Sequence, residues 1–180
     1  MRLAMVGVIL LGTGVFSPAR AEEPKFSFPL IKGYGGVATV PQATEQPQKG
    51  VRVVFDITAE SKPEEVNRGL ESVARYLNLN AQAGNAPSDV KLALVLHGGA
   101  TICALTDEAF RRHAQGEHNP NLPLIRKLRE HGVEVLVCGQ SLARKGYSTN
   151  DVADELTVAA SAMTVNINKQ LLGFAYLSIP

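Results

Sequence analysis

The residues of this chain best suited to covalent chemistry are its two cysteines, Cys103 and Cys138. Cys138 ends an apolar run and is followed directly by Gly139, Gln140 and Ser141. The backbone amides of these three residues would stabilise a thiolate, the nucleophilic form of cysteine, if they converge on its sulfur. Free cysteines are also among the most buried residue types, so an inert core thiol is the alternative interpretation at both positions.

A histidine and two glycines form a second candidate site. His97, Gly98 and Gly99 come directly after the apolar run over 90–96. Ligands and catalytic groups collect at the carboxyl ends of the strands in open parallel sheets, so His97 could assist a thiolate or orient a substrate there. It could equally be a turn residue bonded to the backbone. Asp56 ends another apolar run, and it could join the same edge or cap the following turn.

The pattern along the chain predicts how these residues are positioned. Runs rich in apolar and β-branched residues predict strands over 51–57, 90–96, 133–138 and 173–179. Helical spacing predicts helices over 62–78 (with Ser61 as the N-cap), 106–113, 120–130 and 148–170, and the polar residues 78–89 predict a loop. Strand–helix alternation of this kind favours an α/β fold. We predict a three-layer α/β/α sandwich with a mostly parallel, open sheet of at least four strands.

The first 21 residues have the features of an export signal. Arg2 precedes an apolar segment over 3–16, and Ala19-Arg20-Ala21 supplies the small residues that a signal peptidase needs. The apolar segment is shorter than the roughly 20 residues of a membrane-spanning helix, so cleavage is favoured over a retained anchor. We expect a periplasmic or secreted protein that makes no contact with a membrane after cleavage.

Residues 22–50 are predicted to form an extended N-terminal arm, and a single α/β domain follows over 51–180. The arm is rich in proline and glycine and shows no sustained period. Its apolar residues are too many for a solvated tail, so we expect them to pack on the domain or on a neighbouring subunit: Phe26, Phe28, Leu30, Ile31 and Tyr34.

Charge and missing motifs exclude several classes of protein. Cleavage after residue 21 leaves 16 basic and 17 acidic residues, which provides no electrostatic footprint for nucleic acid. The chain has no esterase nucleophile motif and no dinucleotide- or phosphate-binding loop. Its cysteines and histidines lack the short spacings of a zinc site. We expect neither a metal nor a cofactor.

The combination of motifs resembles the DsrE/DsrF-like sulfur-relay family. The resemblance covers about 51–179 and is carried by the order of elements together with His97-Gly98-Gly99-Ala100, Asn119-Pro120-Asn121-Leu122 and Val137-Cys138-Gly139-Gln140-Ser141. It implies an open α/β/α sandwich, assembly as a trimer or hexamer, and a persulfide carried on Cys138. The export signal and the arm depart from the cytoplasmic members, so the resemblance does not identify the sulfur donor or acceptor.

The leading hypothesis is therefore an exported sulfur-handling protein in which Cys138 accepts and passes on sulfane sulfur as a persulfide. Its partner would be a small sulfur compound or a donor or acceptor protein. A thiol-dependent redox or sulfurtransferase enzyme, with His97 tuning Cys138, is one alternative. An oligomeric ligand-binding module with inert thiols is another. The residues expected to help bind the sulfur compound are Gly98, Gly99, Cys103, Gly139, Gln140 and Ser141.

The two cysteines could also pair with each other in an oxidising compartment. The strands ending at His97 and Cys138 are expected to be neighbours, and Cys103 lies within loop reach of the same edge. A permanent bridge would remove the free thiolate that a carrier needs. We therefore favour free thiols.

Overall fold

A five-stranded sheet forms the centre of the fold. The computed structural model describes residues 25–180, so the predicted signal segment over 1–21 lies outside the described residues. The strands are β1 (Arg52–Ile57), β2 (Lys91–Leu96), β3 (Glu134–Cys138), β4 (Thr157–Ala159) and β5 (Ala175–Ile179). Their order in the sheet is β4-β3-β2-β1-β5, and every pairing is parallel. The prediction of a parallel, open sheet of at least four strands is confirmed.

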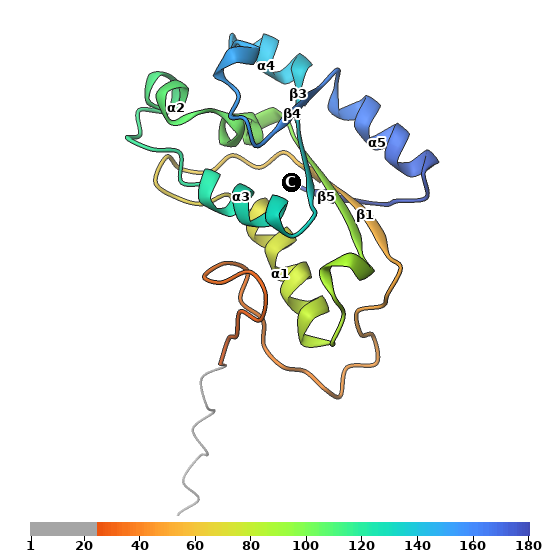
Figure 1. Ribbon diagram of the computed structural model, residues 1–180. Coiled ribbons are helices and arrows are strands. Elements are labelled where there is room, and N and C mark those ends of the chain that lie inside the picture. Colours follow the sequence, from red (N-terminus) through yellow and green to blue (C-terminus); the bar gives the residue numbers. More distant parts are fainter. Residues whose placement is uncertain (1–24) are drawn as a thin grey trace, which may run out of the picture.

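Helices cover both faces of this sheet (Figure 1). On one face lie α1 (Arg68–Gln82), α2 (Asp107–Ala114) and α3 (Leu122–Glu130), and α5 (Ala162–Leu171) lies on the other. Alternation along β1 shows the division, because Phe55 belongs to the larger core under α1 and α3 whereas Val54 belongs to the smaller core under α5. Strands covered on both faces are apolar almost throughout, which explains the uninterrupted runs in the sequence.

The helix predicted over 62–78 is displaced. It begins after Asn67, whose side chain accepts a hydrogen bond from the Gly69 amide and donates one to the Ala59 carbonyl, so Ser61 is not the N-cap. Glu65 instead closes a turn in the segment before it. At the other end α1 continues to Gln82, and the loop predicted from 78 onward was wrong there.

One of the polar residues that suggested a loop, Asn78, is buried and holds the N-terminal arm. Asn78 accepts hydrogen bonds from the amides of Leu30 and Ile31, at 2.9 and 2.8 Å, and donates to the carbonyls of Tyr34 and Gly35, at 2.9 and 3.0 Å. Ile31 is completely buried in the larger core. Leu30 and Tyr34 pack against the same core, so this part of the arm packs on its own domain, whereas Phe26, also expected to pack, is 61% exposed.

The long helix predicted over 148–170 was wrong. Residues 149–151 form the 3₁₀ helix η3 (Thr149–Asp151), and β4 then pairs with the outer edge of β3 before Ser161 caps α5. The apparent helical spacing spans separate elements: Leu156 is buried in the larger core, whereas Met163, on α5, is 72% exposed. The β-branched pair in Thr157–Ala159 fits a strand better than a helix.

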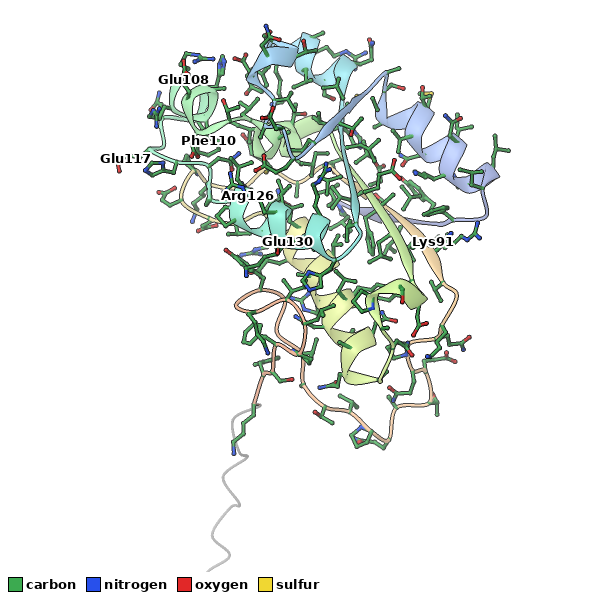
Figure 2. All side chains as sticks on the ribbon, viewed as in Figure 1. Lys91, Glu108, Phe110, Glu117, Arg126 and Glu130 are labelled. Atoms are coloured by element: carbon green, nitrogen blue, oxygen red, sulfur yellow. The ribbon has the colours of Figure 1, made fainter. Side chains whose placement is uncertain are left out.

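Three short helices complete the chain described by the structure: η1 (Pro87–Asp89), η2 (Gly98–Ala104) and α4 (Gly139–Lys145). The last two follow β2 and β3 directly, so they begin at the carboxyl edge of the sheet. Figure 2 labels Lys91 at the opposite, amino end of β2. No helix within residues 25–180 is long and apolar enough to cross a membrane.

Candidate functional site

The carboxyl ends of β2 and β3 bring His97 and Cys138 to neighbouring positions. The two strands pair directly, as predicted, and their register matches Leu96 with Val137. The next positions in this register are His97 and Cys138. His97 keeps an extended backbone, and its amide donates to the Ile57 carbonyl, so the alternation of β2 continues through this residue.

Cys138 lies on the face of the sheet that α5 covers. It is 4% exposed and packs in the smaller core with Val95 and Ala162. Burial by itself opposes ionisation of the thiol and would raise its pKa. Hydrogen bonds from the Ser141 hydroxyl and from the backbone amides of Ala162, Ser141 and Gln140 outweigh burial, and the pKa of Cys138 is lowered. Gln140 and Ser141 are two of the three residues whose amides the sequence suggested, and Gly139 is not among the groups that lower this pKa.

Ser141 also joins the ends of the two strands. Its Oγ accepts a hydrogen bond from the Gly98 amide at 3.3 Å, while its hydroxyl donates to the sulfur of Cys138. Donation by the Gly98 amide polarises the hydroxyl and strengthens the hydrogen bond that it makes to a thiolate. The β2 turn therefore supports the ionised form of a cysteine on β3.

His97 has an acidic partner on β1. Its Nε2 atom lies 2.6 Å from Oδ1 of Asp56, whose other oxygen, Oδ2, accepts a hydrogen bond of 2.7 Å from the Tyr176 hydroxyl. That bond to Asp56 is the main reason why the pKa of Tyr176 is raised. Asp56 thus joins the same edge, as one of its two sequence interpretations anticipated. Tyr176 was missed, because only the pairing of β5 with β1 brings it to this site.

A model of the DsrE/DsrF-like family matches residues 52–179, which is more than two thirds of the chain. The chain belongs to the DsrE/DsrF-like family. The matched range starts with β1 and contains all five strands and both cysteines, whereas the N-terminal arm precedes it. The family predicted from the motifs is therefore confirmed.

Two solved structures resemble this DsrE/DsrF-like chain. A protein of unknown function, MTH1491 from Methanobacterium thermoautotrophicum, is 20% identical, with 72% of this chain and 99% of that chain covered and a TM-score of 0.50. The ychN protein from E. coli is 18% identical, with 72% of this chain and 100% of that chain covered and a TM-score of 0.46. The first of these supports the fold assignment. Among curated proteins, none matches the chain.

The glycines of the two predicted turns have backbone roles in this DsrE/DsrF-like fold. A side chain at Gly99 would lie 2.8 Å from the Glu60 amide, and one at Gly139 would lie 2.9 Å from the Ala159 carbonyl. Gly98 has a φ of +56°, which places it in the left-handed region that favours glycine. These residues allow close approach of the segments that carry His97 and Cys138.

Cys103 is a different kind of thiol. It is completely buried within η2 on the other side of the sheet, in the larger core. Burial raises its pKa to about 11, which the weak contact of 3.9 Å with the Ser61 hydroxyl does not offset. Both cysteines are free, as favoured from the sequence. Cys103 is therefore a neutral core thiol and does not join Cys138.

The remaining predicted residue, Gln140, is exposed and donates a long hydrogen bond of 3.4 Å to the Ala160 carbonyl. Its amide, rather than its side chain, contributes to the environment of Cys138. Within residues 25–180, no group of three or more His, Cys, Asp or Glu side chains is arranged to hold a metal ion.

Proposed function

We propose that this DsrE/DsrF-like protein handles sulfur, with Cys138 accepting sulfane sulfur as a persulfide and passing it on. One observation carries the proposal: the chain has two thiols, and hydrogen bonds favour the ionised form of Cys138 alone. A thiolate is the nucleophile that sulfur transfer requires. The family is generally associated with sulfur relay, which favours sulfane sulfur as the group that this thiolate accepts.

The transfer step is a displacement at sulfur. The Cys138 thiolate attacks the outer sulfur of a donor persulfide, RS–SH, and forms a new bond between Sγ and that sulfur. The RS–S bond breaks, and its electron pair leaves with RS⁻, which becomes RSH once it gains a proton. Attack by an acceptor thiolate on the Cys138 persulfide reverses the same step, so no oxidant or reductant is consumed.

We also propose that the transfer takes place outside the cytoplasm. The sequence features of 1–21, a basic residue before an apolar segment and a small-residue cleavage motif, support an export signal. Sequencing the N-terminus of the protein recovered from the periplasm or medium tests the prediction. Cleavage after Ala21 supports it, and an uncleaved cytoplasmic protein contradicts it.

We propose further that the protein assembles with copies of itself. The outer side of α5 and the edge strand β5 expose large apolar side chains, and β5 pairs on one side only within the described chain. Large apolar side chains exposed on a helix and on an edge strand are typical of interaction sites. The exposed residues are Met163, Ile167, Leu171, Leu172, Tyr176 and Leu177.

Loading with a defined donor tests the carrier function. The reduced protein is treated with glutathione persulfide, and peptide mass spectrometry locates any added sulfur atom. We expect addition at Cys138, its loss in Cys138→Ser, and no change in the matched variant Cys103→Ser. Addition at neither cysteine of the folded protein would overturn the proposal, and repeated turnover of the donor would favour the enzymatic alternative.

A further inference from the structure

The buried Oδ1 atom of Asp56 and the buried Nε2 atom of the half-buried His97 form a polar pair to which the proposed transfer step assigns no role. Asp56 is 8% exposed, and its Oδ1 atom lies 2.6 Å from Nε2 of His97. The distance suits a hydrogen bond, but the alignment does not, and neither atom has another hydrogen-bond partner within residues 25–180. Buried polar atoms are almost always paired, so a buried pair left in this condition points to a functional site.

The sheet register places this pair beside Cys138. Asp56 pairs with Val95, so His97, two residues further along β2, leaves the sheet on the same face as Asp56. Val95 packs with Cys138 in the smaller core, which identifies this as the face that carries the thiol. His97 and Cys138 then occupy neighbouring register positions on strands about 4.8 Å apart.

The third member, Tyr176, fixes one oxygen of the carboxylate. Its hydroxyl donates to Oδ2 of Asp56 at 2.7 Å. With Oδ2 occupied by Tyr176, the other carboxylate oxygen, Oδ1, is the one that lies against Nε2 of His97. The second ring nitrogen of His97, Nδ1, is then the one that can exchange a proton with a substrate. A small rotation of the ring would align Nε2 with Oδ1, and a carboxylate bonded to one nitrogen in that way sets the orientation of the imidazole.

We propose that His97 donates the proton that the leaving thiolate gains during sulfur transfer, and that Asp56 is the positioning residue that holds His97 for this step. The inference rests on the proposed function of Cys138. It adds the group that completes the displacement and explains why a carboxylate from β1, an imidazole from the end of β2 and a phenol from β5 meet on one face of the sheet.

The proton balance closes without another reactant. Transfer of the Cys138 proton to His97 gives a thiolate and an imidazolium. The thiolate attacks RS–SH, the sulfane sulfur becomes bonded to Sγ, and RS⁻ departs with the electron pair. The imidazolium protonates RS⁻ to RSH and returns to its neutral form, so the net change is Cys138–SH + RS–SH giving Cys138–S–SH + RSH.

The choice of leaving group tests this role. In a Cys103→Ser background, Cys138 reacts either with glutathione disulfide, whose aliphatic thiolate needs a proton, or with dithiobis(nitrobenzoate), whose aromatic thiolate leaves readily as an anion. General acid catalysis predicts that Asp56→Asn slows the first reaction about tenfold and the second by less than about twofold. A variant that merely loosens the site would slow both reactions equally, and that result overturns the inference.

A second comparison shows whether Asp56 acts through His97. The double variant Asp56→Asn/His97→Gln should react with glutathione disulfide no more slowly than His97→Gln alone, because the positioning residue has nothing left to position. Additive losses would contradict this coupling. Asp89→Asn is the matched control, since Asp89 pairs with Lys49 before β2 begins, and it should leave both rates unchanged.

Loading from glutathione persulfide separates this inference from the carrier function. Asp56→Asn should slow persulfide formation on Cys138 while leaving its final extent unchanged. Failure of the parent protein to load refutes the carrier function, whereas equal loading rates in both proteins refute the role of Asp56. If Asp56→Asn does not fold, His97→Gln provides the same comparison of leaving groups, and equal slowing with both disulfides then overturns the inference.

Discussion

Removal of the Ser141 hydroxyl tests whether hydrogen bonding makes Cys138 a nucleophile. Ser141 is the first of the groups that lower the pKa of Cys138 against the opposing effect of burial. A hydrogen bond to a charged group is worth about 1.5 kcal/mol or more. Ser141→Ala should therefore reduce the thiolate fraction at neutral pH about tenfold, since each factor of ten corresponds to about 1.4 kcal/mol.

The rate of alkylation should fall by less than the thiolate fraction does. A thiolate that has lost a hydrogen bond is a better nucleophile, and a Brønsted slope of about 0.45 makes it roughly threefold more reactive. The net loss of rate at neutral pH is then about threefold. At high pH, where both proteins are fully ionised at this residue, Ser141→Ala should react about threefold faster than the parent. The two pH–rate curves must cross.

Iodoacetamide labelling followed by mass spectrometry measures both limbs of these curves. Ser141→Thr is the matched control, because it keeps the hydroxyl, and its curve should follow that of the parent. The reasoning is refuted if Ser141→Ala stays below the parent at every pH, or if the two curves coincide. The first result would show that Ser141 acts through packing, and the second that its hydrogen bond to sulfur does not affect the thiolate.

Three further predictions concern stability and assembly. The pKa of Cys103 rises from 9.0 to about 11 on folding, so the unfolded chain loses this proton first as the pH increases. The free energy of unfolding should therefore fall by up to about 2.7 kcal/mol between pH 9 and pH 11. In urea unfolding, Cys103→Ala should lack this dependence on pH, and an unchanged dependence would contradict the assignment. Asn78→Leu should cost about 3 kcal/mol or more, since it leaves four backbone groups of the arm unpaired. The loosened backbone should make trypsin cleave faster after Lys32, which is already exposed, and an unchanged cleavage rate would show that Asn78 does not hold the arm. Light scattering should show an oligomer for the parent protein and a smaller species for Leu171→Glu, and a monomeric parent would refute the proposed assembly.

The sheet was predictable because its strands carry a local signal. Buried parallel strands are continuous apolar runs, so 90–96 and 133–138 identified β2 and β3 to within a residue, and a polar residue or thiol at the end of a run marked the site. The helices were harder to place. Asn78 is buried and polar, and its partners lie on the distant arm, so local composition suggested a loop where tertiary hydrogen bonds stabilise a helix. The start of the helix also depends on a distant residue, because the amide of the buried Asn67 donates to the side chain of Asn121.

Other features depend on register and are invisible in a linear pattern. The contact between Tyr176 and Asp56 requires that β5 pair with β1, although the two residues are 120 positions apart. In the same way, β4 is only three residues long, and it exists because the outer edge of β3 offers it backbone partners. A short strand whose stability comes from a neighbour has no sequence period of its own.

The contrast between the two thiols follows from where the chain leaves the sheet. Both cysteines are buried, and burial alone would raise the pKa of each. Cys138 is the last residue of a strand and lies next to the first turns of α4 and α5. The first amides of a helix have no partner within that helix, so those of Gln140, Ser141 and Ala162, together with the Ser141 hydroxyl, are available to the sulfur. Cys103 lies inside η2, among apolar side chains of the larger core. The supply of unpaired donors, rather than exposure, therefore decides which thiol can act as a nucleophile.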